Sequence, residues 1–286
     1  MDVGVVYFFT DNGPNPVEFA QAAEGYGFES IFVPEHTHFP VSRQTPYPDA
    51  YGGGELPGFY LRTYDQIVTL SMMAAQTETL KLGTGVCLLA QHDPIVKAKQ
   101  FASLDYLSGG RVICGVGMGW NIEEAEAHGV VWKKRFSTVR DKLKVMQALW
   151  TQDEASYSGP MASLEPSWAW PKPAQTNGIR TYLGGAGPVT MRHAAEWADA
   201  WYVVPTAADI TLAKKVPEFR GLVEQAGKDP RSVGIAVASA PPDPKILEAY
   251  RDQGIERAVL WVDPAEDPGE GMRNLEKVAK VLRQIS

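Results

Sequence analysis

Short apolar stretches alternate with amphipathic stretches from one end of this sequence of 286 residues to the other. The apolar stretches are typical of buried β-strands, and the amphipathic stretches repeat their apolar residues at helical spacing. We expect eight strands, at residues 3–8, 30–34, 81–88, 111–117, 181–184, 200–204, 233–238 and 257–262. Strands that alternate with helices form a parallel sheet with helical crossovers. Eight such units predict an α/β fold of the closed (β/α)8 or TIM barrel type, with an open doubly wound sheet as the alternative.

Signals at the ends of helices support this pattern. Asn15 and Asp93 are each followed by proline, which is typical of a helix N-cap and the first helical position. Gly27 is placed to end the first of these helices.

A barrel of this type fills about 250 residues, so we expect residues 1–286 to form one domain. The apolar content of 44% allows a sizeable core, and no apolar run reaches the roughly 18 residues of a membrane span. The N-terminus resembles a first strand more than a signal peptide, and Cys87 and Cys114 lie in strand-like runs as buried thiols would. A cytoplasmic location is expected. A net charge of −7 without a basic cluster argues against a nucleic-acid partner.

Residues 39–64 and 151–178 are too long to be plain connections between these elements. We expect both to be loops inserted at the carboxyl-terminal face of the barrel, because loops of this length are commonly lids or substrate walls. The aromatic side chains expected to line a pocket are Tyr47, Tyr51, Tyr60, Trp120, Trp168 and Trp170. The core is expected to hold Trp150, Trp197 and Trp261.

Glycines follow an unusual pattern in the fourth expected strand. Gly115, Gly117 and Gly119 alternate there, at the strand end where a (β/α)8 barrel carries its functional site. A strand gives up side-chain packing in this way where something approaches its backbone closely. We interpret the approaching group as a flat cofactor.

A second glycine cluster follows the fifth expected strand. Gly184, Gly185, Ala186 and Gly187 precede a helix that begins at Pro188. Free backbone N–H groups at the start of a helix suit a phosphate group. A tight turn without a ligand is the alternative, and the pattern alone does not separate the two.

His36 and His38 are two residues apart at a strand end, a spacing that metal-dependent barrel hydrolases use for metal ligands. Asp263 is the one residue at another strand end that supports a metal, so the metal hypothesis has too few ligands. The functional alternative assigns Glu35 and His36 to hydrogen bonding or proton transfer beside a cofactor. It leaves His38 as a solvated loop residue.

Three acidic residues, Glu123, Glu124 and Glu126, follow Trp120. Acids at the start of a helix complement its dipole, and we favour this role over acid–base chemistry. The sequence has no Gly-x-Ser-x-Gly elbow and no cysteine in an electropositive setting, so a nucleophilic hydrolase is not expected.

Together these motifs resemble the luciferase-like monooxygenase superfamily, and within it the branch of F420-dependent oxidoreductases. The resemblance runs along almost the whole chain. It is most specific between residues 104 and 120, which contain Leu-Ser-Gly-Gly-Arg followed by Gly-Val-Gly-Met-Gly-Trp. The other matching segments are residues 25–30, 34–36, 82–86, 93–94, 98–99, 184–185 and 195–199.

The resemblance implies a flavin or deazaflavin at the carboxyl ends of the strands. It implies a non-proline cis peptide in a bulge of the third strand, and the matching bond joins Gly85 and Val86. It places the cofactor phosphate at residues 184–187 and assigns His36, with Glu35, to proton transfer near the reacting carbon. The cofactor-binding residues implied in this way are Glu35, Gly85, Val86, Gly117, Gly119, Trp120, Gly184, Gly185, Ala186 and Gly187.

Trp120 is a departure from part of this branch. Its sugar-phosphate dehydrogenases carry a catalytic glutamate directly after the Gly-x-Gly of the fourth strand, where this chain has tryptophan. An indole suits stacking on a cofactor or an apolar substrate, so a sugar phosphate is not expected.

The expected function is therefore hydride transfer between coenzyme F420 and a small organic substrate, apolar or conjugated. An FMN-dependent monooxygenase of the same superfamily is the first alternative, and a non-catalytic protein that binds a flavin or deazaflavin is the second. A metal-dependent hydrolase is more remote. The resemblance also implies a homodimer, and neither a nucleic acid nor a membrane is expected as a partner.

Overall fold

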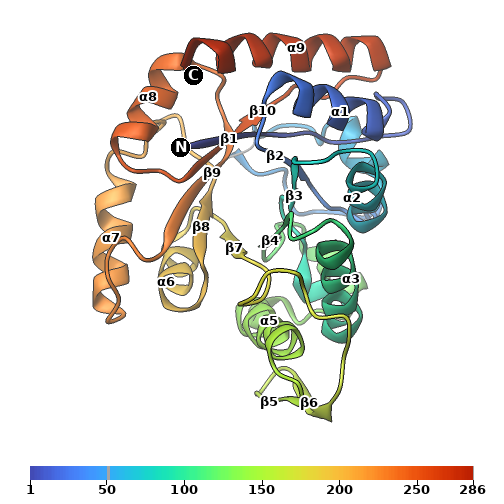
Figure 1. Ribbon diagram of the computed structural model, residues 1–286, viewed down its shortest axis with the longest axis vertical. Coiled ribbons are helices and arrows are strands. Elements are labelled where there is room, and N and C mark those ends of the chain that lie inside the picture. Colours follow the sequence, from blue (N-terminus) through green and yellow to red (C-terminus); the bar gives the residue numbers. More distant parts are fainter. Residues whose placement is uncertain (50–51, 286) are drawn as a thin grey trace.

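A closed barrel of eight parallel strands forms the centre of the computed structural model, which describes residues 1–49 and 52–285 (Figure 1). The hydrogen-bonded order around the barrel is β1-β10-β9-β8-β7-β4-β3-β2. The barrel strands are β1 (Asp2–Val6), β2 (Ser30–Val33), β3 (Lys81–Thr84), β4 (Val112–Val116), β7 (Thr181–Gly184), β8 (Ala200–Val203), β9 (Gly234–Ala240) and β10 (Arg257–Trp261). The predicted (β/α)8 barrel is confirmed, and the open sheet is wrong because β1 pairs with both β2 and β10.

Helices surround the barrel on its outer side (Figure 1). The α-helices are α1 (Pro16–Tyr26), α2 (Gln66–Ala74), α3 (Pro94–Leu107), α4 (Ile122–Ala127), α5 (Arg135–Thr151), α6 (Pro188–Trp197), α7 (Lys215–Gln225), α8 (Pro244–Asp252) and α9 (Pro268–Ile285). Short 3-10 helices are η2 (Gly58–Arg62), η3 (Leu89–Gln91) and η4 (Trp132–Lys134). The predicted caps are confirmed: the side chains of Asn15 and Asp93 accept backbone N–H groups of α1 and α3, and Gly27 ends α1 with a φ of 89°.

The third strand is shorter than predicted. β3 ends at Thr84, and the next peptide bond but one, between Gly85 and Val86, is cis. The backbone then rejoins β4 at Cys87, whose N–H donates to the Gly115 carbonyl at 2.7 Å. Residues 85–88 therefore form a bulge at the carboxyl end of β3, as the family resemblance implied.

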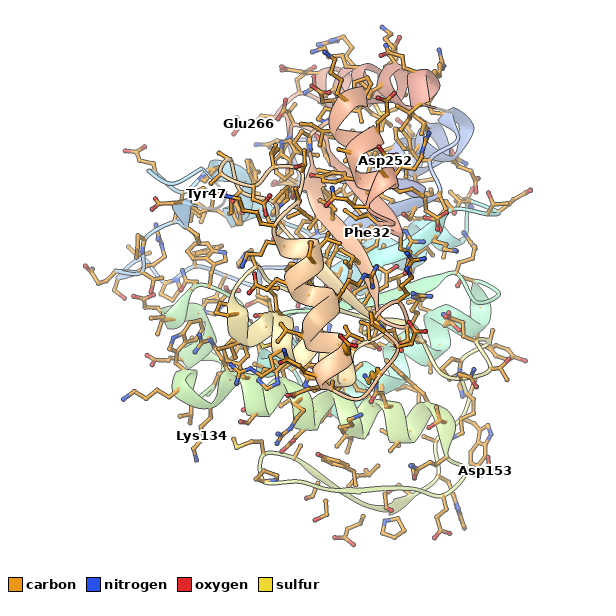
Figure 2. All side chains as sticks on the ribbon, turned by 90° about the vertical axis from the view of Figure 1, so that its left-hand side faces the viewer. Phe32, Tyr47, Lys134, Asp153, Asp252 and Glu266 are labelled. Atoms are coloured by element: carbon orange, nitrogen blue, oxygen red, sulfur yellow. The ribbon has the colours of Figure 1, made fainter. Side chains whose placement is uncertain are left out.

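Residues 151–178 are not the pocket wall that we expected. They form a hairpin of β5 (Ala155–Ser158) and β6 (Ser163–Ser167), which packs against α5. Trp168 and Trp170 are exposed, and Lys172 ties the segment to the end of α5 by donating to the Leu149 carbonyl at 2.9 Å. Figure 2 shows Asp153, next to this hairpin, on the opposite side of the molecule from Tyr47.

Aromatic rings fill the interior of the barrel below the carboxyl ends of its strands. Phe32 stacks on Tyr202 with 5.3 Å between the ring centroids, and Tyr182 lies 6.4 Å from Phe32 and 6.0 Å from Tyr202. At the opposite end, the buried Arg257 guanidinium donates to Glu29 and Asp2. This filling leaves the carboxyl ends of the strands as the place for a cavity.

The two cysteines, Cys87 and Cys114, are buried free thiols, as predicted. Within the described residues, no helix has both the length and the apolar character needed to cross a membrane.

Candidate active site

A cavity of about 500 Å³ opens at the carboxyl ends of the barrel strands. Most of the residues predicted for the site line it: Glu35, His36, Gly85, Val86, Gly117, Gly119, Trp120, Gly184 and Gly185. Ala186 and Gly187 belong to the same turn but do not line the cavity. Tyr47 and Tyr60 line it as predicted, whereas Tyr51 lies outside the described residues.

The alternate glycines of β4 make room for the bulge of β3. A Cβ atom on Gly115 would lie 2.1 Å from the Thr84 carbonyl oxygen, and one on Gly117 would lie 2.3 Å from a methyl group of Val86. A Cβ atom on Gly184 would meet the other Val86 methyl group at 2.7 Å. The group that approaches Gly115 and Gly117 is therefore the chain's own bulge, and contact between a cofactor and the glycines that line the cavity, Gly117 and Gly119, stays a prediction.

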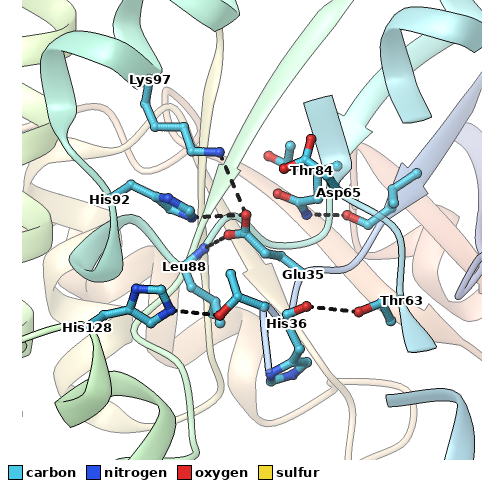
Figure 3. Close-up of polar contacts among 12 residues, drawn as sticks. Glu35, His36, Thr63, Asp65, Thr84, Leu88, His92, Lys97 and His128 are labelled. Carbon is cyan, nitrogen blue, oxygen red and sulfur yellow. Dashed lines mark hydrogen bonds and ion pairs between the residues drawn. The ribbon is translucent and has the colours of Figure 1, made fainter. Parts of the chain in front are cut away.

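Glu35 anchors this bulge from behind. Its carboxylate accepts the Leu88 N–H at 2.7 Å, hydrogen-bonds His92 Nε2 at 2.9 Å and lies 3.7 Å from the Lys97 ammonium (Figure 3). Glu35 is 5% exposed, and burial alone would raise the pKa of its carboxyl group. The hydrogen bond and charge of His92, the charge of Lys97 and the Leu88 N–H outweigh burial and lower this pKa. Glu35 is therefore ionised and fixed.

Glu35, Cys87 and His92 are the one group of three possible metal ligands among the described residues. Burial raises the pKa of the Cys87 thiol well above its usual value, and the neighbouring Glu35 charge raises it further. The Lys97 ammonium also supplies the positive charge that a metal would bring. The chemistry of this donor set favours a structural ion pair.

His36 forms a second pair of the same kind, facing the cavity. Its Nδ1 atom lies 2.8 Å from a carboxylate oxygen of Glu124, and both side chains are almost fully buried. The other oxygen of Glu124 accepts the Thr37 N–H at 3.1 Å. A carboxylate on Nδ1 keeps that nitrogen protonated and orients the ring, so Nε2 is the atom left for acid–base chemistry.

Glu124 is the functional residue that sequence reasoning misjudged. It was expected to complement a helix dipole, but it is 1% exposed and holds the candidate catalytic histidine. The Asn121 side chain caps α4 by accepting the Glu124 N–H at 2.8 Å, and this cap fixes the residue in the first turn. The acid directly follows another acid, so only the fold identifies which of the two faces His36.

His38 does not join His36 as a ligand pair. His38 Nδ1 and His128 Nε2 both hydrogen-bond the Thr37 hydroxyl, at 3.0 and 2.7 Å, away from the cavity. Asp263 accepts the Trp261 indole N–H at 2.7 Å. The three residues of the metal-hydrolase hypothesis, His36, His38 and Asp263, therefore each hydrogen-bond a different residue: Glu124, Thr37 and Trp261.

An aromatic wall faces His36. Trp120 lies 5.8 Å from the His36 ring and 5.7 Å from both Phe39 and Tyr47, measured between ring centroids. Tyr60 packs on the His36 ring at 5.2 Å. Phe8, Phe59 and Trp261 extend the wall, and Trp261 was expected in the core instead. This part of the cavity suits apolar or planar groups.

The turn between β7 and α6 closes the cavity on another side. Gly185 has a φ of 136°, which favours glycine, and its carbonyl accepts the Trp201 indole N–H at 2.7 Å. Gly187 caps α6 without a capping side chain, so the first N–H groups of α6 remain free for an anion. Arg135 lines the cavity as well and was not predicted, although it directly follows Lys133 and Lys134 in the sequence.

The luciferase-like monooxygenase family model matches residues 8–285 of the chain. An uncharacterized protein of Mycobacterium tuberculosis is 39% identical over 286 residues, 99% of both chains. An F420-dependent glucose-6-phosphate dehydrogenase of Amycolatopsis mediterranei is 29% identical over 189 residues, which cover 65% of this chain and 51% of that enzyme.

Solved structures share the fold at lower identity. Monooxygenase RslO1 of Streptomyces bottropensis superposes with a TM-score of 0.78 at 18% identity, covering 99% of each chain. The F420-dependent tetrahydromethanopterin reductase of Methanopyrus kandleri gives 0.75 at 17% identity, over 100% of this chain and 99% of that one. An F420-dependent secondary alcohol dehydrogenase, solved with an F420–acetone adduct, gives 0.73 at 19% identity over 99% of each chain. The chain thus belongs to the luciferase-like monooxygenase family of flavin- and deazaflavin-dependent oxidoreductases.

Proposed function

We propose that this protein is an F420-dependent oxidoreductase that interconverts an apolar alcohol and its carbonyl compound. The observation that carries the proposal is the His36–Glu124 pair, whose free ring nitrogen belongs to a residue that lines the cavity beside the Val86 bulge. A distant relative and two structural neighbours that use F420 support the choice of cofactor.

The cavity fits a deazaflavin in two respects. The cis bulge at Gly85 and Val86 offers a rigid backing, because the Val86 side chain is packed against Gly117 and Gly184. The turn at residues 184–187 and the uncapped start of α6 suit the cofactor phosphate. When bound, F420 supplies the hydride chemistry, and the protein supplies binding, orientation and proton transfer.

We assign to His36 the transfer of the substrate's hydroxyl proton. Oxidation of an alcohol removes a hydride from carbon and a proton from oxygen, and reduction of a carbonyl reverses both. The Nε2 atom of His36 takes the hydroxyl proton in one direction and returns it in the other. Glu124 stabilises the imidazolium form and fixes the ring.

The lining of the cavity favours an apolar substrate over a sugar phosphate. His36 is surrounded by Phe39, Tyr60 and Trp120. Among the described residues that line the cavity, Arg135 is the one arginine or lysine. Arg135 lies at the start of α5 next to the α6 side, and Arg43, which stacks on Trp120 at 5.9 Å, does not line the cavity.

Titration of the purified protein with F420 and with FMN, followed by absorption spectroscopy, tests the choice of cofactor. We expect binding of F420. Binding of FMN alone would refute the proposal in favour of an FMN-dependent monooxygenase, whose phosphate suits the same turn. Binding of F420 with no turnover of any alcohol or carbonyl compound, in the wild type and in His36→Ala alike, would favour a non-catalytic carrier.

We also propose that the protein is a homodimer of single-domain protomers. Adjacent helices α2 and α3 carry exposed apolar side chains, which support an interface on this side of the barrel: Val68, Met72, Ile95, Val96 and Tyr106. Light scattering is expected to give a dimer, and Val68→Glu a monomer. A monomeric wild type would refute the proposal.

A further inference from the structure

Arg135 is a cation at the cavity and has no acidic partner among the residues that the structure describes. Its guanidinium lies between the rings of Trp132 and Phe136, 4.1 and 4.7 Å from their centroids, and donates to the Trp132 carbonyl at 3.0 Å. Its Nε atom is buried and has no hydrogen-bond partner. Arg140, on the same helix, by contrast pairs with Asp141 at 2.9 Å. Two stacked rings therefore hold Arg135 in place with donor capacity unused.

The surroundings of Arg135 are positive. No Asp or Glu occurs between residues 127 and 140, whereas Lys133 and Lys134 directly precede Arg135. Phe136 stacks on His193 of α6 with 5.8 Å between the centroids, so the start of α5 lies beside α6. Figure 2 shows Lys134 on the same side of the molecule as Tyr47, which lines the cavity. The expectation that the chain has no basic cluster overlooked the short run at residues 133–135, of which Arg135 lines the cavity.

We propose that Arg135 binds a carboxylate of the oligoglutamate tail of F420, where the tail leaves the cavity between α5 and α6. This inference rests on the proposed function. The start of α6 provides backbone N–H groups for the phosphate, and Arg135 provides a second anion site on the neighbouring helix. The planar guanidinium suits a carboxylate, and the exposed lysines next to it suit further glutamates of the tail. FMN ends at its phosphate, so this site discriminates between the two cofactors.

The test compares dissociation constants, measured by F420 fluorescence, for three ligands: F420 with several glutamates, its glutamate-free phospholactyl form, and the deazaflavin precursor that lacks both phosphate and tail. In Arg135→Gln we expect the affinity for full-length F420 to fall about tenfold or more, because a hydrogen bond to a charged group is lost. The affinities for the glutamate-free form and for the precursor are expected to change less than twofold. Arg140→Gln is the matched control on the same helix and is expected to leave all three affinities unchanged.

Two outcomes would overturn the inference while the proposed function stands. Equal losses for full-length and glutamate-free F420 would assign Arg135 to the phosphate, and unchanged affinities would remove any role in binding. Wild-type protein that binds FMN but no form of F420 would refute the proposed function and this inference with it. Arg135→Lys keeps the positive charge but lacks the planar guanidinium. It is expected to lose less affinity for full-length F420 than Arg135→Gln. Circular dichroism of both variants shows whether they are folded.

Discussion

Glu35 and His36 are neighbours in the chain, and each forms a carboxylate–histidine pair, yet the two pairs face opposite ways. Glu35 binds His92 and lies against Lys97 and the bulge, whereas the His36 ring points away from that cluster (Figure 3). His36 binds Glu124 beside the aromatic wall. In the first pair the carboxylate is the central group, and in the second it supports the histidine.

Surroundings explain why one chemical pair serves two purposes. Around Glu35, every strong partner favours the ionised carboxylate, so this pair holds one protonation state and fixes the Leu88 N–H. Around His36, Glu124 engages one ring nitrogen and leaves the other for the cavity. A carboxylate–histidine pair whose polar atoms all have partners stabilises the structure. A pair with one unused ring nitrogen can transfer a proton.

Removal of His36 is expected to have the largest effect on turnover. In His36→Ala, kcat falls about 10²–10⁴-fold because the proton acceptor is lost, while the affinity for F420 changes little. Steady-state kinetics and fluorescence titration measure the two quantities. His38→Ala is the matched control, because His38 hydrogen-bonds Thr37 outside the cavity, and it is expected to keep kcat. Equal turnover in His36→Ala and wild type would remove the catalytic assignment.

Removal of the Glu35 charge is expected to act on stability instead. Glu35→Gln leaves Lys97, which is 4% exposed, without its counter-charge, and the free energy of unfolding falls by about 3 kcal/mol. Urea denaturation measures this loss. Because the pKa of Glu35 is lowered in the folded state, its contribution is present above the unfolded pKa and is lost as the pH falls through the folded one. A variant that keeps wild-type stability but loses turnover would place Glu35 in the chemistry.

Glu124→Gln is expected to have a smaller effect on turnover than His36→Ala. The amide still fills the site but supports the imidazolium less, so kcat falls about 10- to 100-fold with KM nearly unchanged. Partial recovery of kcat in Glu124→Asp would show that the charge matters. A loss confined to KM or to stability would contradict a positioning role for Glu124.

Local sequence patterns were sufficient to predict the barrel and the place of its site. Alternating strands and helices and the caps at Asn15 and Asp93 are encoded within a few residues of each other. The cis bond between Gly85 and Val86 and the inward position of His36 followed from the family resemblance.

Contacts between distant segments were not predictable in this way. Val86 packs against Gly117 and Gly184, and the pairing of His36 with Glu124 joins residues 88 apart in the chain. The hairpin at residues 151–178 was missed because its strands are short and its tryptophans suggested a pocket. In each case the partner, rather than the residue, decides the role.

Substitution of Glu123, next to Glu124, is expected to have the smallest effect on the kinetics. It tests whether the loss of a negative charge anywhere in this turn affects turnover, or only its loss at Glu124. The Glu123 carboxylate accepts the N–H groups of Gln44 and Thr45 at 2.7 and 3.0 Å and so holds the segment that carries Tyr47. Burial opposes ionisation, but a hydrogen bond from the Thr45 side chain, together with those from the backbone N–H groups, prevails and lowers the pKa of Glu123 to about 2. The stabilisation is therefore present at neutral pH and is lost only as the pH falls from the unfolded value near 4.5 toward 2.

In Glu123→Gln we expect KM for a bulky apolar substrate to rise less than about threefold, with kcat unchanged, because the amide oxygen keeps hydrogen bonds of ordinary strength. Kinetics of Glu123→Gln and Glu124→Gln, measured side by side, compare two adjacent acids that hold two parts of one loop, residues 44–45 and 36–37. A fall in kcat as large as that in Glu124→Gln would mean that any loosening of this loop disables His36. The difference between the two histidine pairs would then be due to the rigidity of this loop. The free Nε2 atom of His36 would no longer explain the turnover.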